Sequence, residues 1–189
     1  AVLRALNGIG SEANWLETTF KRLEARSFAD MWIKNYGDMT VGGVSSDFAG
    51  LQGAGKLHLT LASTLTLDEA INSGGAEIIV TASEGLVLNA AVRSGGGNIT
   101  FHAGTFISLS SVASIDGESG APLVSLEADG GAITMASGSF IDGAGGRVEL
   151  DATGDVSVTS ITSTGDVSVT SSAGSILDVL NNGLPRIVG

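Results

Sequence analysis

Apolar and polar residues alternate along most of this chain, and the alternating runs return at a regular interval. Alternation with a period of two is typical of strands whose side chains point to opposite faces. The repeated apolar positions are Leu57, Leu59, Leu61, Leu65, Leu67 and Ile71, then Ile78, Val80, Ala82, Leu86, Leu88 and Val92, then Ile99, Phe101, Ala103, Ile107, Leu109 and Ala113. A fixed period of about 20 residues with short strands in each unit predicts a solenoid.

The repeat continues toward Gly183 with variable spacing. The letters SIDG at 114–117 return as FIDG at 140–143, a longer interval than before, which indicates insertions between strands. The letters GDVSVTS at 154–160 return much sooner, at 165–171, which we interpret as a shortened period. Six coils of roughly 19–26 residues each therefore fit between Gly55 and about Gly183.

A single coil cannot bury its one inward row of apolar side chains. Stacked coils can, because parallel strands about 4.8 Å apart place equivalent side chains above one another. Leu57 is therefore expected below Ile78, and Ile78 below Ile99. The 28 glycines gather between the strands, where corners need positive φ angles. The predicted fold is all-β, a right-handed parallel β-helix.

The chain is expected to form a single β-solenoid domain over residues 1–189. Residues 1–45 are predicted to be atypical, aromatic-rich coils, residues 46–183 regular coils, and residues 184–189 a tail or junction. One alternative remains for the first part. Leu16, Phe20 and Leu23 also match the period of an amphipathic helix at about 12–26, which would cap a β-helix of six to seven coils.

Charge is distributed unevenly along the sequence. Residues 1–36 contain five Lys and Arg and four acidic residues, whereas residues 37–189 contain four basic and sixteen acidic residues. The net charge of −11 disfavours binding to nucleic acid or to anionic lipid. The sequence has no cysteine and no run of about 18 apolar residues, so we expect no thiol chemistry and no membrane insertion.

Few residues offer chemistry. His58 and His102 each lie between inward-facing residues, so both are expected to point outward, in different columns, with a structural or solvated role. The best acidic cluster is Asp116, Glu118 and Asp142, which the repeat places at one corner of successive coils. Capping of Asp-Gly turns is a simpler role for these carboxylates than glycosidase chemistry. We therefore predict no catalytic residues, no metal site and no cofactor.

Several phrases carry a resemblance to a known family. Residues 7–20 read NGIGSEANWLETTF, residues 35–43 read NYGDMTVGG, and residues 174–178 read GSILD. These phrases resemble the β-helix module of giant bacterial surface proteins of the filamentous-haemagglutinin-like type, in which Trp15 is usually proline. The resemblance implies that residues 1–45 form two more coils rather than a helix, so that the whole chain forms about eight coils. It also implies that the segment after GSILD leads into another copy of AVLRALNGIGS, as in a tandem array.

The expected function is a non-enzymatic structural or adhesive segment of a secreted bacterial surface fibre, located outside the cell. Its expected partners are further copies or tandem repeats, stacked head to tail, and a host or neighbour-cell surface glycan or protein. Because uncapped coils expose apolar rows, we name candidate stacking residues at both ends: Trp15, Phe20, Trp32, Leu180, Leu184 and Ile187. The alternative function is a β-helical carbohydrate-binding or carbohydrate-active protein.

Overall fold

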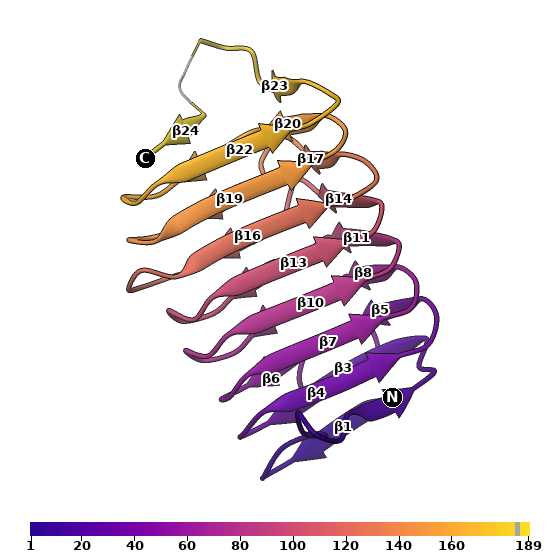
Figure 1. The fold of residues 1–189 in the computed structure, drawn as a ribbon. Helices are drawn as coiled ribbons and strands as arrows, with labels where there is room; N and C mark the ends of the chain where they lie inside the picture. The colour runs from indigo at the N-terminus through magenta and orange to yellow at the C-terminus, as the bar shows by residue number, and fades with distance from the viewer. Residues whose placement is uncertain (184–185) are drawn as a thin grey trace.

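Short parallel strands stack along one axis to form a β-solenoid of about eight coils (Figure 1). This arrangement is seen in a computed structural model, which describes residues 1–183 and 186–189. The strands form three faces, and most coils contribute one strand to each face. No helix long and apolar enough to cross a membrane occurs within the described residues.

Face 1 is a sheet of eight parallel strands, most of which lie on the side nearest the viewer in Figure 1. Its members are β2 (Leu16–Thr18), β4 (Met31–Asn35), β7 (Leu57–Leu61), β10 (Ile78–Ala82), β13 (Ile99–Ala103), β16 (Leu123–Ala128), β19 (Arg147–Ala152) and β22 (Val167–Ser171). Alternate residues of these strands are buried, as in Leu57, Leu59 and Leu61 of β7.

Faces 2 and 3 are joined into one sheet of 16 strands by β3 (Arg22–Ser27), which bends between them. Face 2 continues with β5 (Met39–Val41), β8 (Leu65–Leu67), β11 (Gly85–Leu88), β14 (Phe106–Leu109), β17 (Ile133–Met135), β20 (Val156–Val158) and β23 (Ile176–Asp178). Face 3 contains β1 (Val2–Ala5), then β6 (Leu51–Gly53), β9 (Ile71–Asn72), β12 (Ala91–Arg93), β15 (Ser114–Asp116), β18 (Phe140–Asp142), β21 (Ile161–Thr162) and β24 (Ile187–Val188).

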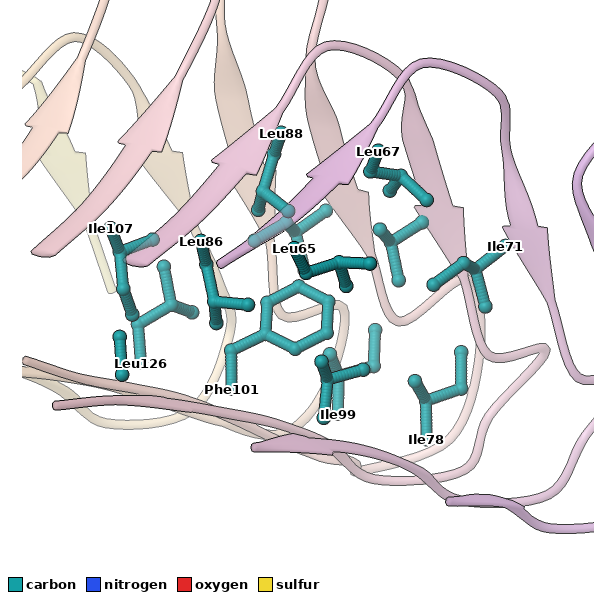
Figure 2. Close-up of a cluster of buried hydrophobic side chains, with 14 of the residues drawn as sticks. Leu65, Leu67, Ile71, Ile78, Leu86, Leu88, Ile99, Phe101, Ile107 and Leu126 are labelled. Carbon is teal, nitrogen blue, oxygen red and sulfur yellow. The ribbon is translucent and has the colours of Figure 1, made fainter. Parts of the chain in front are cut away.

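The predicted columns of side chains are confirmed by the strand register. Leu57 pairs with Ile78, and Ile78 pairs with Ile99. The longer interval between SIDG and FIDG leaves the columns intact, because Ile115 still pairs with Ile141. Figure 2 shows part of the resulting core, in which the Phe101 ring lies among aliphatic side chains of faces 1 and 2, and Ile71 of face 3 points into the same interior. This narrow interior accounts for the small number of aromatic residues.

The alternative helix at 12–26 is wrong. The chain forms β2 and β3 there, with a corner at residues 19–21. Leu16, Phe20 and Leu23 contact the same core, as a helical stripe would, but they reach it because the chain turns a corner between two faces. Tertiary packing against the next coil therefore overrides local helix propensity.

The shortened period inferred from the repeated letters GDVSVTS is confirmed, although the two copies of these letters lie on different faces. The first copy forms β20 on face 2, whereas the second forms β22 on face 1 of the next coil. Successive strands of face 1 are 19 residues apart here, since Val148 pairs with Val167, against 24 residues between the paired Val124 and Val148. The same short sequence can thus form a strand on either face, because each face requires only a strand with alternating apolar residues that follows a corner.

Candidate functional site

The C-terminal end of the solenoid leaves apolar side chains uncovered on all three faces. Val167 and Val169 of β22 pack against the core but are only partly buried. Ile176 in β23 is 52% exposed and Ile187 in β24 is 39% exposed. Leu180 is half-buried after β23, and Leu184 lies outside the described residues. No described strand covers β22, β23 or β24, so their outer edges carry unpaired backbone groups.

The N-terminal end is similar. Leu3 and Ala5 of β1, Leu16 of β2 and the corner residue Phe20 pack against the core while remaining partly exposed. Seven apolar residues of the described chain pack against the core but are only partly buried. Six of them lie at the two ends: these four, and Val167 and Val169 at the C-terminal end. Incomplete burial of core residues is thus a property of the two ends.

Trp15 and Trp32, named from the sequence as candidate stacking residues, lie near the N-terminal end: Trp15 directly precedes β2, the end strand of face 1, and Trp32 is buried in β4, the next strand. Trp32 lies on the outer side of face 1, in the column that continues with His58 and Ile79. The rings of Trp15 and Trp32 pack edge to face with centroids 5.3 Å apart. The His58 ring lies 3.9 Å from the Trp32 ring. These three residues form the aromatic cluster of face 1.

An ion pair holds the aromatic cluster in place. Glu77 Oε1 lies 3.0 Å from His58 Nε2 and 2.9 Å from Lys56 Nζ. The hydrogen bond from Lys56, and secondarily that with His58, lowers the pKa of Glu77 below its ordinary value of 4.5. The carboxylate therefore stays ionised at neutral pH and fixes one nitrogen of the imidazole ring.

A groove of about 700 Å³ runs beside Trp15 on the outer side of face 1. It is lined by Ala13, Asn14, Trp15, Glu17, Lys34 and Thr60. Glu17 accepts a hydrogen bond of 2.9 Å from the hydroxyl of Tyr36, and the Lys34 ammonium lies over the Tyr36 ring at 4.9 Å. The groove thus combines the Trp15 ring with polar groups that can donate or accept hydrogen bonds.

The acidic cluster named from the sequence lies at one corner, as the repeat placed it. Asp116 and Asp142 pair in register on face 3, and Glu118 follows β15 with a positive φ of 61°. Each aspartate accepts a hydrogen bond from a backbone amide two residues later, at 2.7 Å from Glu118 and 2.8 Å from Ala144. Glu118 also lies 3.5 Å from Arg93. These contacts fit the turn-capping role.

Two buried or partly buried carboxylates fix the loop at 42–50, and the repeat pattern singled out neither of them. Glu24 is fully buried, and its Oε1 accepts hydrogen bonds from the amides of Val44 at 2.6 Å and Ser45 at 3.1 Å. Glu69 accepts from Gly43 at 3.0 Å and from Gly50 at 2.7 Å. A side chain at Gly50 would place its Cβ 1.9 Å from the carbonyl oxygen of Ala70.

No family model matches the sequence, and searches of curated proteins and of solved structures found no match. The parallel β-solenoid is therefore established by the structure alone. The likeness to filamentous-haemagglutinin-like modules rests on the sequence phrases.

Proposed function

We propose that this chain is a structural segment of a bacterial surface fibre, secreted and located outside the cell, and that it stacks head to tail with neighbouring copies or modules. It serves as a rigid spacer that presents adhesive surfaces and catalyses no reaction. The observation that carries the proposal is the incomplete burial of core residues at both ends of the solenoid. The resemblance to filamentous-haemagglutinin-like modules supports the location and the adhesive role.

The two ends offer complementary strand positions. A second copy placed on the C-terminal end brings its β1 above β24, its β2 above β22, and the first part of its β3 above β23, so each face continues by one strand. The inward columns continue as well. The column that starts at Leu3 ends at Ile187, and the column that starts at Leu16 ends at Val169. Stacking thus covers the exposed apolar residues and pairs the open edges.

Charge favours the same orientation. Residues 1–36 contain one more basic than acidic residue, whereas residues 150–189 contain four acidic residues and one arginine. A head-to-tail contact therefore brings the less acidic end of one copy to the acidic end of the next, and contact between two C-terminal ends is disfavoured by repulsion.

Stacking is tested by sedimentation across a wide dilution series. We expect the average mass to rise with concentration, and I187D and V169D to abolish the rise because a carboxylate would be buried in the contact. V112D is the matched control, since Val112 is 72% exposed on the side of the solenoid. Circular dichroism of each variant checks folding. A wild-type chain that stays monomeric throughout, or an equal effect of V112D, contradicts the proposal.

Carbohydrate binding is the second candidate, and the groove beside Trp15 favours it. An aromatic ring offers a flat apolar surface to the C–H groups of a sugar, while Asn14, Glu17 and Lys34 can bond its hydroxyls. The two candidate functions are distinguished by different variants. If carbohydrate binding is correct, W15A abolishes binding to an array of glycans and I187D leaves it unchanged. If stacking is correct, I187D abolishes the rise in mass in sedimentation and W15A leaves it unchanged.

A further inference from the structure

One histidine and two carboxylates converge on the outer side of face 1, away from both ends and from the aromatic cluster. His102 lies in β13, Glu127 lies in the next strand, β16, and Asp129 follows that strand. One nitrogen or oxygen of each side chain lies within 4.8 Å of the others. The closest pair is His102 Nε2 and Asp129 Oδ2, at 2.9 Å. We call these residues the His102 triad.

The backbone holds two members of the triad at a fixed separation. His102 and Glu127 are partners in the parallel register of β13 and β16, so their side chains leave the sheet side by side. Asp129 is two residues beyond Glu127 and follows the end of β16. Its carboxylate also lies beside the His102 ring. All three side chains are accessible from solvent, with His102 39% and Asp129 54% exposed. An ion can therefore reach them directly.

The column that contains the triad has an excess of negative charge. Glu127 pairs in register with Asp151 of the next coil, which places two carboxylates directly opposite each other. Within the described residues, the side chains of Glu127 and Asp151 form no hydrogen bond or ion pair, and Arg147 binds Glu149. Like charges opposite each other in a sheet are destabilising. A bound cation would remove this repulsion.

We propose that His102, Glu127 and Asp129 bind a zinc ion that links two adjacent coils of the solenoid. Zinc takes imidazole nitrogen at about 2.0–2.1 Å and carboxylate oxygen at about 2.0–2.2 Å, commonly with water in a fourth position. Ligand atoms around a tetrahedral zinc are about 3.3 Å apart, and the three atoms here already lie within 4.8 Å of one another. The imidazole favours zinc over calcium and magnesium, which take oxygen ligands.

His58 shows why the other histidine does not form such a site. Its nearest carboxylate, Glu77, already binds Lys56, and the Trp32 ring packs against the imidazole. A positive ammonium beside the same carboxylate opposes binding of a second cation. His58 therefore provides a matched control within the same chain. The zinc site is independent of stacking, since it lies within one copy.

The test uses the whole chain without a histidine tag, freed of metal by dialysis against a chelator. Zinc chloride is titrated by calorimetry, and cobalt replaces zinc in a second titration so that visible absorption reports the geometry of the site. We expect one zinc per chain, an intense tetrahedral cobalt spectrum, and a rise in melting temperature with zinc. H102A and the double variant E127Q/D129N are each expected to weaken binding by roughly 10-fold or more.

Control measurements decide the assignment. H58Q is expected to leave the zinc affinity unchanged, and D151N to weaken it by less than H102A, because Asp151 adds charge without belonging to the triad. Melting temperatures of the metal-free variants check folding. The proposal is overturned if no saturable one-to-one binding is found, if H102A binds zinc as the wild type does, if H58Q weakens binding as much as H102A, or if calcium binds as tightly as zinc.

Discussion

Phe101 is the residue on which the central packing depends. It is the single aromatic residue that the structure places in the fully buried core of the described chain, at 1% exposure. It lies between Val80 and Leu126 in one column of face 1. Because the strand register fixes the backbone of all three residues, neighbouring side chains have little freedom to fill a space left at this position.

Replacement of Phe101 by alanine is therefore expected to destabilise the protein by about 3–5 kcal/mol, the usual cost of removing a buried aromatic ring that leaves a cavity. Urea unfolding followed by circular dichroism measures the change. F140A is the control, since Phe140 is 41% exposed, and its loss is expected to cost less than about 1 kcal/mol. Equal losses for the two variants would show that the core can close around the missing ring.

The hydrogen-bond partners of individual side chains were the feature that the sequence predicted least well. The outward direction and separate columns of His58 and His102 follow from alternation, and the register confirms both. Their carboxylate partners do not follow from it. Asp129 reaches the His102 ring only because a longer corner before β16 changes the spacing between successive strands of face 1. The length of a corner does not specify its path.

The loop between β5 and β6 is the element that departs most from the regular coil. Two carboxylates from neighbouring coils, Glu24 and Glu69, accept four backbone hydrogen bonds from it. Glu24 Oε2 is buried without a partner among the described residues. A buried amide without an acceptor lowers the stability by about 1–3 kcal/mol. The loop therefore keeps the conformation in which its amides reach these two carboxylates.

Loss of either carboxylate is expected to release one part of this loop. E24A should increase amide exchange at Val44 and Ser45, and E69A should increase it at Gly43 and Gly50, because each variant removes the acceptor of those amides. Exchange measured by NMR resolves the four positions. The amides of β10 are the internal control and should not change. Exchange that rises equally across the chain in both variants would indicate general destabilisation and would contradict the expected local effect.

Elements were predictable wherever inward residues alternate within a strand. The strands from β7 to β14 follow directly from the regular period of the apolar positions. Residues 12–26 were ambiguous because a corner brings Leu16, Phe20 and Leu23 to one core just as a helix would. The repeated letters GDVSVTS indicate the shortened period but not the face of each copy, because identical strands fit different faces. A local pattern specifies a strand, and only the count of residues between corners assigns it to a face.

Across the whole molecule, each coil packs only against its neighbours. An end coil therefore has one neighbouring coil, and a central coil has two. Amide exchange should therefore be slowest in central strands such as β10 and β13, and fastest in β1 and in β22 to β24. Exchange followed by mass spectrometry at low and high protein concentration tests this. At high concentration, stacking should slow exchange in the end strands alone. Uniform protection along the chain would contradict this prediction.

All strands that pair along the solenoid are parallel, and this has a consequence for assembly (Figure 1). The surface at β1 differs from the surface at β24, so contact between them is heterologous and, unlike a twofold contact, leaves one free surface of each kind. If copies stack as proposed, their assembly has no step at which it closes. A fibre built in this way would be polar, with a different growing surface at each tip, and its length would be limited by supply or by a dedicated terminator.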